Sequence, residues 1–154
     1  MNFPIKVLLI CLPVISQAFD YHSLADAVGV AESNSNTQAV GDNGKARGAY
    51  QMWRIAWDQV NKERAKDKRY RYPWTYAHDS IISRQYAVEY LRWCGSTLEK
   101  ELGRKPYYWE VYASYARGVE TFKDECGFKY SELPARTKRA IGIIAAQLKE
   151  IPPR

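Results

Sequence analysis

The pattern of the sequence changes from helical to turn-forming within AESNSNTQAVGDNGKARGAYQM, residues 31–52. Leu24, Val28 and Glu32 recur at helical spacing before and into this stretch, so Glu32 falls on the margin of the apolar stripe of a helix. Asparagines, glycines and an aspartate then crowd residues 34–48, a density of turn formers that predicts a tight hairpin or an irregular loop. The chain therefore carries one carboxylate to the border between a helical core and a polar loop.

Outward from this stretch, apolar residues recur mostly at helical spacing. The spacing predicts helices over about 52–62, 80–100 and 108–117, and a last one around 141–148. The charged segment 61–74 has Pro73 near its end and is expected to be an exposed connection. A chain of 154 residues suits a single domain. We therefore expect a mainly α (α+β) domain over residues 19–154, with a short β-hairpin or irregular loop after the first helix.

The first 18 residues have the pattern of an export signal. Lys6 precedes an apolar run from Val7 to Ile15, and Ser16-Gln17-Ala18 forms a small-x-small cleavage site. The run is too short to span a bilayer. We therefore expect cleavage after Ala18, a secreted or periplasmic protein, and no stable membrane insertion once the signal is removed.

The charge of the chain is basic, with 23 Lys and Arg against 17 Asp and Glu. Cleavage after Ala18 removes Lys6 and no acid, which leaves a net charge of about +5. Nucleic acid, acidic membrane surfaces and bacterial wall polymers are all anionic partners for such a protein. Export makes nucleic acid the least favoured of these, and no nucleic-acid-binding motif is present. We expect a monomer that binds no nucleic acid.

Outside the signal, the chain has two cysteines, Cys94 and Cys126. In an oxidising compartment an isolated pair of this kind predicts a disulfide. The two histidines, His22 and His78, are far apart in the sequence and offer no recognisable zinc spacing. We expect neither a metal nor another cofactor.

Two carboxylates flank the start of the polar loop. Burial beside apolar side chains raises the pKa of a carboxyl group, so Glu32 is a candidate general acid. Asp42 lies in a polar, solvated turn where it should stay ionised, and such a pair performs glycoside hydrolysis in lysozyme. An ordinary helix-end acid and an ordinary turn residue are the competing interpretation of the same pattern.

The segments AES and GKARGAYQM resemble the lysozyme-like superfamily as seen in lytic transglycosylases of the soluble-lytic type. That family has Glu-Ser at a helix end, a polar loop, and then Gly-Ala or Gly-Pro, an aromatic residue or Leu, Gln and an apolar residue. The resemblance implies that Glu32 is the catalytic acid and that Gln51 lines a sugar cleft. It also makes Ser33, Gly48 and Tyr50 candidates for substrate binding, and Tyr50 is the aromatic residue best placed to face a sugar ring.

Two further segments extend the resemblance. The turn AVGDNG is similar to the corresponding turn of invertebrate-type and related bacterial lysozymes, whose aspartate falls on Asp42. The segment ASYARG, residues 113–118, resembles the family's Ala-x-Tyr-Asn-x-Gly, in which the tyrosine faces the catalytic acid. Tyr115 and Gly118 fit this pattern, whereas Ala116 replaces the asparagine and removes any contact made through its amide. Core packing explains Tyr115 equally well.

The resemblance implies that the substrate is peptidoglycan and that the enzyme cleaves the β-1,4 bond between N-acetylmuramic acid and N-acetylglucosamine. Glu32 would protonate the leaving oxygen. A 1,6-anhydro product would identify a lytic transglycosylase, and a hydrolytic product supported by Asp42 would identify a muramidase. The main alternative is a secreted glycan-binding module on the same scaffold without turnover.

Overall fold

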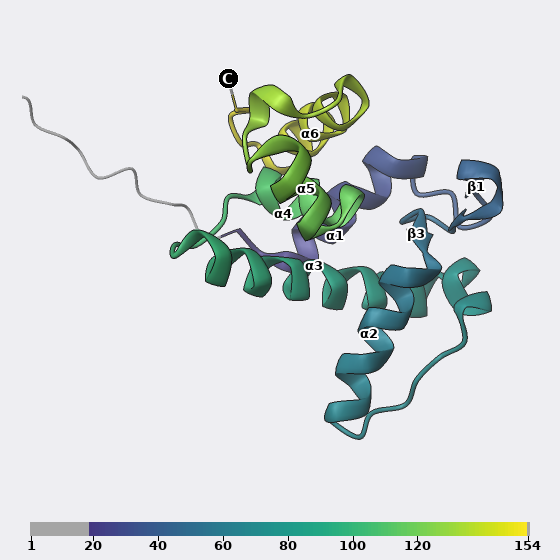
Figure 1. Cartoon of the computed structure of the whole chain (residues 1–154). Coiled ribbons are helices and arrows are strands. Elements are labelled where there is room, and N and C mark those ends of the chain that lie inside the picture. Colours follow the sequence, from purple (N-terminus) through teal and green to yellow (C-terminus); the bar gives the residue numbers. More distant parts are fainter. Residues whose placement is uncertain (1–18, 154) are drawn as a thin grey trace, which may run out of the picture.

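The computed structural model describes residues 19–153, so the export signal predicted over residues 1–18 lies outside the described residues. The described chain is mainly helical, with six α-helices and a small three-stranded antiparallel sheet after the first helix (Figure 1). This confirms the predicted helical class and the hairpin that follows the first helix. The helices are α1 (Tyr21–Ser33), α2 (Arg54–Lys66), α3 (Ser80–Leu102), α4 (Tyr108–Arg117), α5 (Val119–Cys126) and α6 (Ala135–Leu148).

The long helix α3 is the centre of the packing. It packs against α1, α2 and α4, and α1 also packs against α6. In Figure 1, α3 runs beneath α4 and α5. Asp79 caps its start by accepting hydrogen bonds from the backbone N–H groups of Ile81 and Ile82, and Gly103 ends it in the left-handed conformation. Its buried residues include Tyr86, Leu91 and other side chains that face α1, α2 and α4. Burial of these side chains supplies much of the hydrophobic stabilisation of the domain.

The first helix holds Glu32 at the edge of this core. Asp20 caps α1 by accepting a hydrogen bond of 2.8 Å from the backbone N–H of Ser23, and Asn34 ends the helix at a φ of 54°. Leu24 and Val28 are fully buried on the face that leads to Glu32 one turn later. The predicted position of Glu32, between core and loop, is therefore the observed one.

The hairpin consists of three strands of two residues each, β1 (Val40–Gly41), β2 (Ala46–Arg47) and β3 (Met52–Trp53). They pair in the order β1-β2-β3, with the short 3₁₀ turn η1 (Asp42–Gly44) between the first two. Gly48 turns the chain between β2 and β3 at a φ of 74°. A Cβ there would lie 1.8 Å from the carbonyl oxygen of Ala77, in the 3₁₀ turn η2 (Trp74–His78). Glycine therefore allows the hairpin to pack directly on that turn.

The helix bounds differ from the expected ones in several places. Helix α2 begins at Arg54, after β3, and continues to Lys66, where it buries Arg64, so the first part of the connection predicted to be exposed is helical. Helix α6 begins at Ala135, earlier than the predicted helix around 141–148. Helix α5 was not predicted, because Gly118 indicated only the end of α4. With a φ of 83°, Gly118 instead turns the chain from α4 directly into α5. A third 3₁₀ turn, η3 (Tyr130–Glu132), then leads to α6.

The predicted disulfide is wrong, because Cys94 and Cys126 are both buried free thiols in the structure. Cys94 lies in the middle of α3, where burial raises the pKa of its thiol. The thiol of Cys126, at the end of α5, instead lies 3.6 Å from the backbone carbonyl of Glu132. The prediction used the number of cysteines and the compartment, and neither determines which way a cysteine side chain points.

Over residues 19–153, no helix combines the length and the apolar character needed to cross a membrane.

Candidate active site

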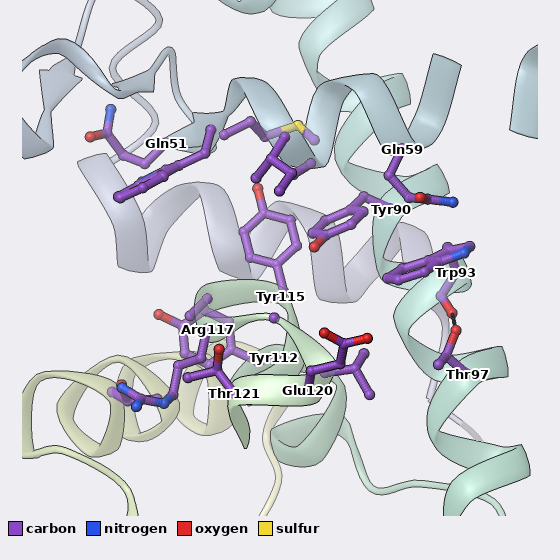
Figure 2. Close-up of a pocket in the computed structure, with 18 of the residues that line it drawn as sticks. Gln51, Gln59, Tyr90, Trp93, Thr97, Tyr112, Tyr115, Arg117, Glu120 and Thr121 are labelled. Carbon is purple, nitrogen blue, oxygen red and sulfur yellow. Dashed lines mark hydrogen bonds between the residues drawn. The ribbon is translucent and has the colours of Figure 1, made fainter. Parts of the chain in front are cut away.

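A cleft of about 1030 Å³ runs along the side of the molecule where the hairpin and α2 face α4, α5 and α6. Figure 2 shows Gln51 and Gln59 on its upper side, Glu120 and Thr121 on its lower side, and Trp93 and Thr97 of α3 toward one end. Of the residues predicted from the sequence, the cleft is lined by Glu32, Asp42, Gln51 and Tyr115. The fold therefore brings together residues from α1, the hairpin and α4.

Glu32 is a partly buried acid in the cleft wall. Its Oε1 accepts a hydrogen bond of 2.8 Å from the hydroxyl of Tyr112. Burial is the largest influence on the pKa of Glu32 and raises it, and the charge of Asp42 acts in the same direction. The Tyr112 hydrogen bond and the charge of Arg136 lower the pKa, but the net shift is upward. The last turn of α1 acts in the same direction, because the negative end of a helix dipole disfavours a carboxylate. Glu32 therefore keeps its proton to a higher pH than an exposed glutamate.

Asp42, in the turn η1, also lines the cleft, and each of its carboxylate oxygens contacts another side chain. Oδ2 accepts a hydrogen bond of 3.0 Å from the indole Nε1 of Trp53. Oδ1 forms an ion pair of 3.4 Å with the guanidinium of Arg136, in the first turn of α6. Asp42 and Asn43 both adopt the left-handed backbone conformation, which Asp and Asn tolerate better than most residues. The turn thus directs the Asp42 carboxylate toward the aromatic edge of the hairpin and toward α6.

Gln51 lines the cleft with a strained backbone. Its φ of 47° is in the left-handed region, which is unusual for glutamine. Its side-chain Nε2 donates a hydrogen bond of 2.9 Å to the carbonyl of Gly48, and its Oε1 lies against Gly41. Such strain persists only where the surroundings impose it, and it concentrates at functional sites.

The tyrosine that contacts the acid is Tyr112, one helical turn before the predicted Tyr115. Tyr115 lines the cleft, but its hydroxyl donates a hydrogen bond of 2.7 Å to the backbone carbonyl of Tyr50. The rings of Tyr112 and Tyr115 stack with their centroids 6.4 Å apart. The helix that carries the motif thus contacts Glu32, but through Tyr112, because the tertiary arrangement directs the Tyr115 hydroxyl to the hairpin.

Three residues predicted to bind substrate lie outside the cleft lining and have structural contacts. The Ser33 hydroxyl donates a hydrogen bond of 2.7 Å to the carbonyl of Ala49, which ties the end of α1 to the hairpin. Gly48 allows the contact with η2 described above. Tyr50 is 7% exposed and packs on Gly29, so the prediction that its ring faces a sugar is wrong. Ser33, Gly48 and Tyr50 therefore hold the hairpin against α1 and η2.

Sequence reasoning missed several cleft residues. Trp53 follows the recognised motif by one residue, and at 43% exposure it is an aromatic side chain available in the cleft. Trp93 lies within the helix predicted over residues 80–100, where nothing in the sequence indicated a site, yet it lines the cleft and stacks on Tyr90 with ring centroids 5.6 Å apart. Arg136 lies 94 residues beyond its partner Asp42 and carried no local signal.

Among residues 19–153, no group of three or more His, Cys, Asp or Glu side chains is arranged to hold a metal ion. Comparisons of the chain with known protein families, with curated proteins and with solved structures found no match.

Proposed function

We propose that this protein is an exported, lysozyme-like enzyme that cleaves the β-1,4 bond between N-acetylmuramic acid and N-acetylglucosamine in peptidoglycan. The observation that carries the proposal is Glu32, a partly buried carboxyl group in the wall of a large cleft, whose pKa is raised by burial and whose hydrogen-bond donor is a neutral tyrosine hydroxyl. A general acid must hold its proton near the working pH and reach the substrate. Burial raises the pKa of Glu32, and its side chain lies in the cleft wall, and both observations support this role.

The cleft suits an extended polar polymer with apolar faces. Trp53 lies on the hairpin side, whereas the stacked pair of Trp93 and Tyr90 lies on α3. Aromatic rings pack against the apolar face of a sugar ring and leave its hydroxyls free for hydrogen bonds. The polar side chains of Gln59 and Thr97 lie on either side of Trp93 in Figure 2. This combination supports a glycan strand as the occupant.

In the proposed reaction, Glu32 donates its proton to the leaving oxygen of N-acetylglucosamine as positive charge develops at the anomeric carbon of N-acetylmuramic acid. The 6-hydroxyl of the same muramic acid then attacks that carbon and returns its proton to Glu32, which yields a 1,6-anhydro end. The contacts of Asp42 favour this route over hydrolysis assisted by a second carboxylate, because both of its oxygens already face protein partners.

The test is mass spectrometry of purified peptidoglycan digested with the wild type, with Glu32→Gln and with the control Glu99→Gln. Glu99 is an exposed residue of α3 outside the cleft lining, so the control makes the same chemical change away from the proposed site. We expect anhydro-terminated fragments from the wild type and the control, and a loss of at least about 100-fold in Glu32→Gln. Reducing ends would identify a muramidase. Cleavage that survives Glu32→Gln would refute the assignment of Glu32.

A secreted glycan-binding module is the second proposal, and Ala116 favours it. This residue lies in the cleft at the place where the resembling family has an asparagine, so a polar contact of that family has no counterpart here. A binding module would sediment with insoluble peptidoglycan without releasing fragments, and Glu32→Gln would bind as well as the wild type.

A further inference from the structure

Asp42 accepts a hydrogen bond from Trp53, an aromatic residue of the cleft. Trp53 is 43% exposed and lines the cleft, so its ring is a large apolar surface without a protein cover. Ile55, two residues on, also lines the cleft and is 77% exposed. Exposed apolar side chains gathered in a cleft indicate a binding surface.

The orientation of Trp53 is fixed by two contacts. The Asp42 carboxylate accepts the indole N–H at 3.0 Å, and the ammonium of Lys45 lies 5.6 Å from the ring centroid. A hydrogen bond to a charged acceptor is stronger than one between neutral groups, and a cation over the ring adds a further attraction. An exposed indole would otherwise turn about two side-chain dihedrals, so holding it in advance reduces the entropy lost when a ligand packs on it.

Asp42 also connects the two sides of the cleft. Its ion pair with Arg136 joins η1 of the hairpin to the start of α6. The Arg136 side chain is 78% exposed and the Asp42 side chain 33%, so this pair contributes at most about 1 kcal/mol. The hydrogen bond with Trp53, at 3.0 Å, is the shorter of the two contacts.

We propose that Asp42 is a positioning residue, which holds the indole of Trp53 as a platform for a sugar ring in the cleft. The proposal rests on the proposed function, since the platform takes a saccharide of the same glycan strand. Asp42 then acts on substrate binding through Trp53, and the chemical step proceeds without its carboxylate.

The variants follow from the geometry. Asp42 has a φ of 47°, so Asp42→Gly removes the side chain without forcing an unsuitable residue into the left-handed conformation. Asp42→Asn tolerates the same backbone and keeps an oxygen that accepts the indole N–H, but it cannot serve as a catalytic carboxylate. Trp53→Phe keeps an aromatic ring and removes the N–H donor.

Kinetics on soluble peptidoglycan strands separate positioning from catalysis. We expect Asp42→Gly and Trp53→Phe each to raise KM up to about tenfold with kcat within about twofold, because one hydrogen bond to a charged group is lost. The double variant should be no worse than the poorer single variant, since both changes remove the same contact. Asp42→Asn should stay within about twofold of the wild type in both constants. A 100-fold lower kcat in Asp42→Asn, or additive effects in the double variant, would overturn the proposal.

A measurement without substrate distinguishes failure of this inference from failure of the proposed function. Acrylamide quenching of Trp53 is obtained as the difference between each protein and the same protein carrying Trp53→Phe. Quenching should rise in Asp42→Gly and not in Asp42→Asn, and equal quenching in the wild type and Asp42→Gly overturns the positioning role. A wild type that neither cleaves nor binds purified peptidoglycan overturns the proposed function and the sugar platform. In that case the quenching result tests only whether Asp42 holds the Trp53 indole in place.

Discussion

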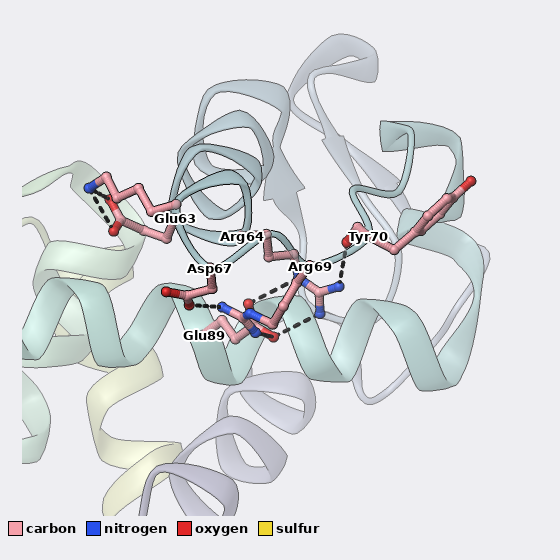
Figure 3. A network of polar contacts seen from close by, with 7 residues as sticks. Glu63, Arg64, Asp67, Arg69, Tyr70 and Glu89 are labelled. Atoms are coloured by element: carbon pink, nitrogen blue, oxygen red, sulfur yellow. Dashed lines mark hydrogen bonds and ion pairs between the residues drawn. The ribbon is translucent and has the colours of Figure 1, made fainter.

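Glu32 and Glu89 are both partly buried glutamates, but their partners differ in charge. Glu89, on α3, accepts two hydrogen bonds from Arg64 at 2.7 and 3.0 Å and one from Arg69 at 3.0 Å (Figure 3). Glu32 accepts its hydrogen bond from the neutral hydroxyl of Tyr112. The charge of Glu89 is thus compensated by two guanidinium groups in direct contact, whereas burial makes the charge of Glu32 costly.

Glu110 resembles Glu89 in this respect. It is 1% exposed, and it accepts hydrogen bonds from Arg104 at 2.6 and 2.9 Å and from the backbone N–H of Tyr107 at 2.7 Å. Both arginine-paired acids tie segments of the fold together, and neither lines the cleft. The comparison teaches that a buried acid with a cationic partner keeps its charge compensated within the fold, whereas Glu32 lies in the cleft with a neutral donor and bears the cost of burial, on which its proposed role as a general acid rests.

The largest effect on stability should come from Glu89→Gln. Arg64 is only 4% exposed, so the substitution leaves a buried guanidinium without its carboxylate, and we expect a loss of about 3 kcal/mol in the free energy of unfolding. Urea unfolding measures it, with Glu99→Gln as the control. Peptidoglycan cleavage by the folded variant should be unchanged. A loss below about 0.5 kcal/mol would remove the contrast between the two glutamates.

Glu110→Gln should have a smaller effect of about 2 kcal/mol. The variant loses charge-assisted hydrogen bonds, but Arg104 is 46% exposed and regains water when its partner is neutralised. The same urea titration measures this loss. If Glu110→Gln lowered the free energy of unfolding more than Glu89→Gln does, burial of the acid, and not of the arginine, would determine the cost.

Glu32→Gln should stabilise the protein at neutral pH, by about 1 kcal/mol, as substitutions at functional residues often do. Because the pKa of Glu32 is raised in the folded state, the folded protein holds a proton that the unfolded chain has lost, and stability falls as pH rises from the unfolded value toward the folded pKa. The neutral amide of the variant has no such penalty and still accepts the Tyr112 hydrogen bond. Thermal unfolding between pH 4 and pH 8 should show a gain that disappears at acidic pH, and a loss of stability at pH 7 contradicts the expectation.

The smallest effect should be that of Tyr112→Phe. The Tyr112 hydroxyl donates to the charged form of Glu32 and lowers its pKa, so its removal should raise the pKa further. The basic limb of the pH profile for peptidoglycan cleavage should move to higher pH, and the rate at neutral pH should change less than about tenfold. A shift of this limb to lower pH would mean that Tyr112 does not stabilise the carboxylate.

Local patterns predicted much of the fold. The apolar stripe of α1 placed Glu32 at the edge of the core, and the turn formers of residues 34–48 predicted the hairpin. Both succeeded because helical periodicity and turn chemistry depend on near neighbours in the chain. Helix α5 was missed because a glycine after a helix marks a break in direction without saying whether a second helix follows.

The sequence by itself determined that one acid stands between a helical core and a polar loop, since this requires only the periodicity of α1 and the composition of residues 34–48. Tertiary structure alone decided that Tyr112 donates to this acid, that Arg136 reaches Asp42, that Trp53 and not Tyr50 is exposed to the cleft, and that Cys94 and Cys126 stay apart. The physical reason is that these contacts join segments distant in the chain. Their partners are set by how whole helices pack, and a one-dimensional pattern does not contain that geometry.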